Sequence, residues 1–175
     1  MQPSSADAPL ILTLRLDEDS FALLTGLRKQ HFPRERNHLS AHVTLFHALP
    51  GAENARLRRD LEEVAGATEV LSLRFPGLRF LGRGVAVDIE CPELLRLRSE
   101  LAHRWRDSLG AQDAQGWKHP HVTIQNKVAP DVARALFEEM SETWGTRAGR
   151  GVGLQLWRYR GGPWEAVEEF KFNSF

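Results

Sequence analysis

Apolar and polar residues alternate over several short stretches of the chain, and a period of two residues predicts β-strands. The first stretch runs from Leu10 to Leu16, where leucine occupies every second position. The same reasoning predicts further strands at 41–46, 69–75, 84–89, 120–126, 152–159 and 164–172. The pair Gly161-Gly162 between the last two predicts a hairpin.

Between these strands, apolar residues recur every three to four positions, which is the period of an α-helix. Asp17 suits the N-cap of the first helix, and Pro92 and Pro130 suit the first turns of two others. A further helix is expected over roughly 53–65, and residues 111–119 are expected to form a polar loop. The order strand, helix, strand, helix, strand then occurs twice, which predicts two similar lobes in one domain over residues 10–175, preceded by a loose tail at 1–9.

Two tetrapeptides occupy equivalent places in this duplicated order. They are His42-Val43-Thr44-Leu45 and His121-Val122-Thr123-Ile124. On a strand, alternate side chains share a face, so each motif presents a histidine and a threonine together. Lobes related by an approximate two-fold axis would place both histidines in one central cleft. Two histidines there can divide the work of general acid and general base.

Composition narrows the possible functions. The 175 residues have a formal net charge of zero, which argues against coating long nucleic acid by charge alone but allows a local basic cleft. One cysteine, Cys91, excludes an intramolecular disulfide framework and a multi-cysteine zinc site. The polar N-terminus does not resemble a signal peptide, and no apolar run is long enough to span a membrane. We therefore expect a cytoplasmic protein with no membrane partner.

The paired motifs, with the segment Gly77-Leu78-Arg79-Phe80-Leu81-Gly82 and the extended second motif that begins at Pro120, resemble the 2H phosphoesterase superfamily and its LigT-like, 2′-5′ RNA ligase branch. The resemblance implies a bilobal α+β fold with a cleft between two antiparallel sheets and helices outside. It implies chemistry without metal or cofactor on 2′,3′-cyclic phosphates or 2′-5′ phosphodiester linkages, with a small nucleotide or an RNA end as substrate. His42 and His121 match the catalytic histidines, and Thr44 and Thr123 match the phosphate-binding residues.

The chain departs from that branch after each motif. Members often carry an arginine shortly after the second motif, where this chain has Gln125-Asn126-Lys127. After the first motif it has Phe46-His47, where a Phe-Leu-Gly sequence is common. These differences indicate a divergent member and bear on the substrate more than on the chemistry.

Other residues are weaker candidates for the site. Trp117 and Lys118 could stack a base and pair with a phosphate, although a loop aromatic and a solvated lysine would look the same. Lys127 has the strand parity of His121 and could reach the cleft. Arg34 and Arg36 could form a basic lip, but a solvated charge run is the simpler interpretation, and His38 is expected at the surface.

Two other classes of function stay open. One is a non-catalytic module that binds RNA or nucleotides in the same cleft. The other is a metal-dependent hydrolase that uses His119 and His121, although zinc normally requires three protein ligands. We expect no metal site, and we expect the protein to be a monomer.

Overall fold

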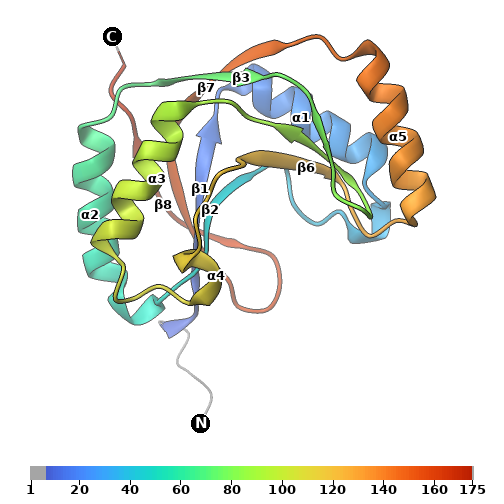
Figure 1. Cartoon of the computed structure of the whole chain (residues 1–175). Helices are drawn as coiled ribbons and strands as arrows, with labels where there is room; N and C mark the ends of the chain where they lie inside the picture. Colours follow the sequence, from blue (N-terminus) through green and yellow to red (C-terminus); the bar gives the residue numbers. More distant parts are fainter. Residues whose placement is uncertain (1–6, 175) are drawn as a thin grey trace.

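The computed structural model describes residues 7–174 and contains two antiparallel β-sheets with helices around them (Figure 1). The α+β class and the two antiparallel sheets are confirmed. The elements, in chain order, are β1 (Leu10–Leu16), α1 (Glu18–His31), η2 (Arg34–Arg36), β2 (Val43–Leu49), η3 (Gly51–Glu53), α2 (Asn54–Gly66), β3 (Leu71–Phe75), β4 (Leu78–Phe80), β5 (Val85–Asp88), α3 (Pro92–Arg104), α4 (Ala111–Ala114), β6 (His121–Gln125), α5 (Pro130–Thr143), β7 (Arg147–Arg158) and β8 (Glu165–Lys171).

The first sheet has five strands, and β7 is its longest. β1 lies between β2 and β7, and all of these neighbours are antiparallel. β3 pairs with residues 147–151 of β7, and β8 pairs with residues 153–158. The expected hairpin at the end of the chain is therefore present as β7 and β8.

The second sheet has three strands, in the order β4-β5-β6. Gly84 precedes β5 at a point where its backbone lies directly against that of Gln125, and a Cβ atom would have no room there. Only glycine allows such a close approach, and the register of β5 against β6 shifts at the next residue, Val85. The second motif lies on β6, which is an edge strand of this sheet and approaches β5 closely at Gly84.

The two sheets do not correspond to the two halves of the sequence. β7 and β8 come from the second half but belong to the sheet of β1 and β2: β1 pairs along its whole length with residues 151–158 of β7. The strand β4 and the short helix α4 were not predicted; α4 lies inside the expected loop 111–119. Residues 1–6 of the expected tail lie outside the described residues, and within the remainder the carbonyl of Pro9 accepts a hydrogen bond from the amide of Tyr159.

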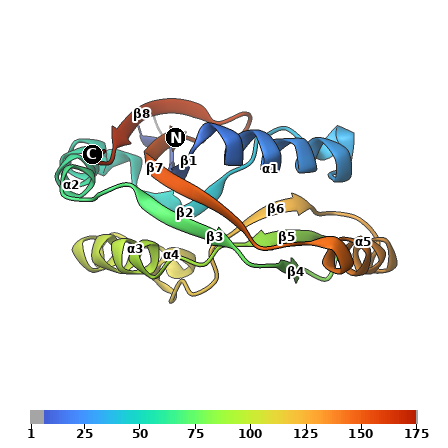
Figure 2. The same cartoon turned by 90° about the horizontal axis from the view of Figure 1, so that it is seen from above.

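Each motif strand is covered by a helix from the other half of the sequence. In Figure 2, α1 lies next to β6 in the upper part of the view, and α3 and α4 lie in the lower part, where α4 contacts β2. The Asp17 side chain caps α1 as expected, since it accepts a hydrogen bond from the amide of Ser20. On the other side, Phe46 of β2 packs edge-to-face on Trp105, which follows α3, with ring centroids 5.2 Å apart.

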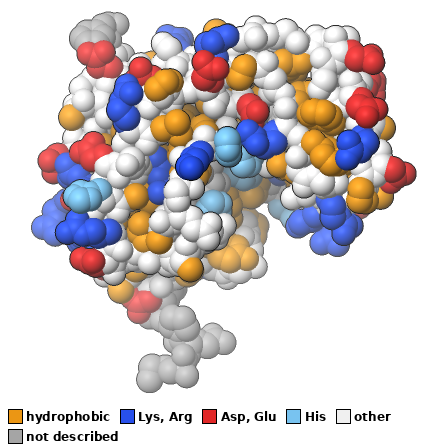
Figure 3. All heavy atoms as spheres, viewed as in Figure 1, with side chains coloured by type: hydrophobic (Ala, Val, Ile, Leu, Met, Phe, Trp, Pro, Cys, Tyr) orange, Lys and Arg blue, Asp and Glu red, His pale blue; other side chains and the backbone are white. Residues whose placement is uncertain are grey.

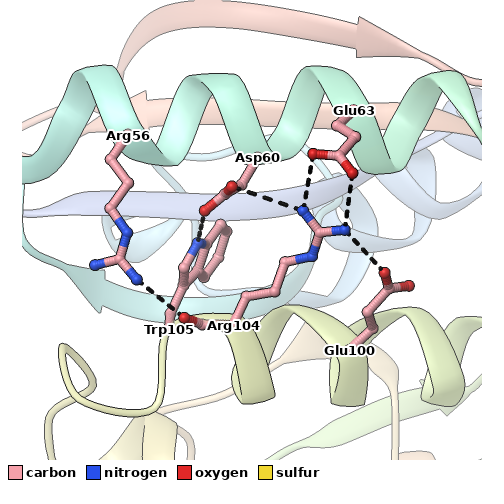
Figure 4. A network of polar contacts seen from close by, with 6 residues as sticks. All are labelled: Arg56, Asp60, Glu63, Glu100, Arg104 and Trp105. Atoms are coloured by element: carbon pink, nitrogen blue, oxygen red, sulfur yellow. Dashed lines mark hydrogen bonds and ion pairs between the residues drawn. The ribbon is translucent and has the colours of Figure 1, made fainter.

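A polar network joins α2 to α3 beside the core (Figure 4). Trp105 is completely buried, and its indole N–H donates to Asp60 at 2.8 Å, so the buried donor has a partner. Arg104 binds both oxygens of Glu63 and also contacts Glu100. The network therefore links α2 to α3. Within residues 7–174, no helix combines the length and the apolar character needed to cross a membrane.

Candidate active site

The two motifs show the alternation that their sequences predict. In each, both apolar residues are completely buried, whereas the histidine and the threonine are partly exposed. His42 lies immediately before β2, and His121 is the first residue of β6. Thr44 pairs with Thr13 of β1, and Thr123 pairs with Ala86 of β5. The apolar side of each motif anchors it in the core and leaves the polar side free.

Both histidines are oriented by the same hydrogen bond. Nδ1 of His42 lies 2.9 Å from the carbonyl oxygen of Ser40, and Nδ1 of His121 lies 2.8 Å from that of His119. A carbonyl oxygen can only accept, so each Nδ1 carries the proton and donates it. This bond leaves Nε2 of each ring as the atom available for proton transfer.

The two imidazoles lie within electrostatic reach of each other. Burial lowers the pKa of His42, and the charges of Arg28 and His121 lower that pKa further, against the bond to the Ser40 carbonyl, which raises it. The neutral form of His42 is therefore favoured near neutral pH, in which Nε2 can accept a proton.

A cleft of about 680 Å³ opens beside His42, and we call it the main cleft. Its walls come from the end of α1, the loop 32–42, the segment 123–127 and the β7–β8 loop 159–164. On the face shown in Figure 3, histidine and Lys or Arg side chains gather around a hollow in the middle of the molecule. His42 also borders a smaller hollow of about 280 Å³, whose wall includes Phe21 and Trp157.

Arg28 enters the main cleft from α1, and sequence reasoning missed it. The residue is 4% exposed. Its Nη1 donates to the carbonyl of Thr123 at 2.8 Å, and its Nε donates to the carbonyl of Leu39 at 3.1 Å. It therefore links the loop before the first motif to the strand of the second. One signal was available: Arg28 lies four residues after buried Leu24, on the face of the helix that packs inward.

The β7–β8 loop supplies an aromatic wall that the sequence analysis also missed. Trp164 contacts the His42 ring edge-to-face, with centroids 5.0 Å apart, and lies 6.1 Å from the ring of Trp157. Tyr159 lines the same cleft and is 43% exposed. The only available signal was the Gly161-Gly162 turn, which predicted the hairpin but not where its loop would lie.

Only some of the predicted site residues line the main cleft. His42, Thr123 and Lys127 line the main cleft, together with Arg36 and His38, which were expected to be solvated. Thr44 and His121 do not line it, although His121 lies two residues before Thr123 on the same strand.

Trp117 and Lys118 lie away from the main cleft. Trp117 is partly buried against the core, and Lys118 borders a separate hollow of about 200 Å³ beside His119. The structure therefore does not bring these two candidates together with His42.

His47 forms a contact outside the site. Its Nδ1 lies 3.3 Å from the carboxylate of Asp113, which also accepts from the amides of His47 and Ala48. These hydrogen bonds outweigh burial and lower the pKa of Asp113.

Among residues 7–174, no group of three or more His, Cys, Asp or Glu side chains is arranged to hold a metal ion. This statement covers the surroundings of His119 and His121.

Comparison with known proteins agrees with this arrangement. A family model described as the 2′-5′ RNA ligase superfamily matches residues 16–163. The chain therefore belongs to the 2′-5′ RNA ligase superfamily, whose LigT-like branch its motifs resemble.

Solved structures show the same fold. TT0787 of Thermus thermophilus is 17% identical, with a TM-score of 0.67 over 95% of this chain and 98% of that chain. LigT of E. coli complexed with 3′-AMP is 15% identical, with a TM-score of 0.63 over 95% and 99% of the two chains. LigT complexed with ATP is 16% identical, with a TM-score of 0.57 over 95% and 98%. Among curated proteins, no match is found.

Proposed function

We propose that this protein is a metal-independent phosphoesterase that acts on 2′,3′-cyclic phosphates or 2′-5′ phosphodiester linkages of RNA ends or small nucleotides. The observation that carries this proposal is the identical orientation of the two motif histidines. Each Nδ1 is held by the carbonyl two residues earlier, which leaves both Nε2 atoms for the substrate. A binding module would not need two histidines prepared in the same way.

In the proposed reaction, His42 acts as base and His121 as acid when water opens the ester. Nε2 of neutral His42 takes a proton from the water whose oxygen attacks phosphorus. Nε2 of protonated His121 donates its proton to the ribose oxygen as the bond from that oxygen to phosphorus breaks. The lowered pKa of His42, together with its free Nε2, supports its assignment as the base. Reversal of the reaction exchanges the two roles.

The threonines and nearby donors would hold the phosphate during this step. Thr44 and Thr123 share the strand faces of the histidines, so their hydroxyls can donate to the non-bridging oxygens, where charge develops. Lys127 lines the main cleft beside this position and adds positive charge to the surroundings of the substrate. The structures of E. coli LigT were determined with 3′-AMP, phosphate, ATP and NADP⁺, which supports a nucleotide as ligand here.

A substrate screen tests the proposal. Purified protein is incubated with 2′,3′-cyclic nucleotides and 2′-5′ dinucleotides, with and without EDTA, and products are separated by chromatography. We expect turnover of at least one of these classes, unchanged by EDTA. Tight binding without turnover in the whole panel would favour the binding module instead, and activity abolished by the chelator and restored by a metal would contradict the scheme.

A further inference from the structure

The main cleft is lined by cations and by no carboxylate. Arg28, Arg36 and Lys127 line it along with His38 and His42, and its lining includes neither Asp nor Glu. Three smaller hollows of the described chain all have carboxylates in their walls. Because the whole chain has a formal net charge of zero, this positive charge is concentrated locally and is not a general property of the surface.

These cations also lack acidic partners. Arg15, Arg58, Arg79 and Arg104 all pair with carboxylates, but no ion pair within residues 7–174 involves Arg28, Arg36 or Lys127. Arg28 is the sharpest case, since it is 4% exposed and its acceptors, two backbone carbonyls and the side-chain oxygen of Asn37, carry no full charge. A buried guanidinium with no counter-charge is costly, so a bound anion would relieve it.

The number of cations exceeds what one reacting phosphate requires. A cyclic phosphate or a phosphodiester carries a single negative charge, and the histidines and threonines of the motifs already provide its donors. We infer that the main cleft binds a substrate with a second phosphate group, held by Arg28, Arg36 and Lys127 beside the phosphate that reacts at the histidines. This inference rests on the proposed function and narrows its substrate class.

The backbone at Lys127 fits such a role. Lys127 has a φ of 63°, the one positive φ of a non-glycine residue within the described chain, and its amide donates to the side chain of Asn126 at 2.9 Å. This left-handed conformation is unfavourable for lysine, and residues kept in such conformations cluster at binding and active sites. The turn places Lys127 in the cleft wall, where Trp164 and Tyr159 form the aromatic side for a base.

Three substrates distinguish the origin of the second phosphate. The first is adenosine 2′,3′-cyclic phosphate, which has one phosphate. The second is the same compound with a 5′-phosphate, and the third is a dinucleotide with an internal 3′-5′ linkage and a terminal 2′,3′-cyclic phosphate. We expect kcat/KM to be at least about tenfold higher for the second, the third or both, which corresponds to one additional charged contact. A preference for the second substrate identifies a terminal 5′-phosphate as the bound group, and a preference for the third identifies an internal phosphodiester.

Matched variants assign the preference to the cleft. Arg36→Ala and Lys127→Asn remove exposed charges, and asparagine tolerates the positive φ at position 127. The double variant is expected to reduce the preference to about twofold or less. Arg34→Ala is the control, because Arg34 belongs to the same short helix but does not line the cleft, and it should keep the preference. Equal kcat/KM for all three substrates in the wild type, or a preference that the double variant retains, would overturn the inference.

A binding measurement separates this inference from the proposed function. Calorimetry compares adenosine 2′-monophosphate with adenosine 2′,5′-bisphosphate on the wild-type protein at fixed ionic strength. At least about tenfold tighter binding of the bisphosphate, lost in the double variant, supports the second phosphate site even if no substrate turns over. Equal affinity for the two ligands contradicts it, even if cyclic phosphates are hydrolysed.

Discussion

Two buried arginines occupy corresponding places in the two halves of the molecule, and their surroundings differ. Arg28 of α1 links the loop before the first motif to the carbonyl of Thr123, on the strand of the second. Arg98 of α3 links the carbonyl of Asp113, before the second motif, to that of Leu45, on the strand of the first. Each therefore connects the two motifs across the halves of the chain.

Each of the two guanidinium groups packs against a phenylalanine ring, but only one of them has a carboxylate nearby. Arg98 lies 4.0 Å from the ring centroid of Phe46, and Arg28 lies 4.4 Å from that of Phe32. Burial lowers the pKa of both guanidinium groups, and only for Arg98 does a carboxylate, Asp113, oppose the effect. Arg28 instead faces the main cleft.

The comparison separates a structural role from a binding role. In the half that contains Arg98, the carboxylate of Asp113 in α4 favours the charged form of the buried guanidinium without forming a direct ion pair with it. In the half that contains Arg28, the missing counter-charge can be provided by a ligand. The same architectural element thus serves stability in one half and, in our proposal, anion binding in the other.

The largest expected effect comes from removing either catalytic histidine. We expect His42→Ala and His121→Ala each to reduce kcat by about 100- to 10,000-fold on whichever substrate the screen identifies, because each removes a proton carrier. The double variant should be little worse than either single variant, since the two residues act together. Thr44→Ala and Thr123→Ala should cost less, as each removes one hydrogen bond. Wild-type rates in either histidine variant would contradict the paired mechanism.

The stability of the protein should depend on the Asp113 carboxylate, which lies in the same half as Arg98. Asp113→Ala is expected to lower the free energy of unfolding by about 3 kcal/mol, because it leaves the amides of His47 and Ala48 without their acceptor and removes the negative charge that favours buried Arg98. Urea denaturation followed by circular dichroism measures this change. Asp107→Asn, at an exposed position, is the control and should change stability little. A loss below about 1 kcal/mol for Asp113→Ala would mean that the Asp113 carboxylate does not stabilise the fold.

Exchanging the two arginines for methionine should produce opposite results. Arg98→Met should be more destabilising than Arg28→Met by about 1–2 kcal/mol, because a nearby carboxylate, that of Asp113, favours the buried guanidinium only at Arg98. Arg28→Met should weaken adenosine 2′,5′-bisphosphate binding about tenfold, and Arg98→Met should not. Calorimetry and urea denaturation of the same preparations provide both values. Equal losses of stability and of affinity in the two variants would remove the distinction between the halves.

The smallest expected effect is a pH dependence of stability. Burial, with the charges of Arg28 and His121, lowers the pKa of folded His42 below its unfolded value of about 6.5. The unfolded chain therefore binds a proton first as the pH falls, so the free energy of unfolding should decrease below about pH 6.5, until folded His42 is itself protonated. The decrease should be smaller in His42→Gln. A profile that is identical in wild type and variant would show that His42 is not perturbed.

Local sequence pattern determined the four long helices, every strand except β4, and the place of each motif. The alternation in His42-Val43-Thr44-Leu45 and in its counterpart was enough to predict which side chains are buried, because a strand turns successive residues to opposite faces. The Asp17 cap and the terminal hairpin followed from short-range signals for the same reason. The duplicated order of elements and the paired motifs were also sufficient to indicate the family.

Tertiary structure alone decided what surrounds those motifs. Arg28 and Arg98 meet carbonyls 95 and 53 residues away, and the loop that carries Trp164 reaches His42 only because β7 pairs with β1. No periodicity encodes such contacts, since they depend on how the sheets and helices of the two halves pack. Whether an arginine finds Asp113 or an open cleft is likewise settled by packing, because charge balance depends on distance in space and not on position in the chain.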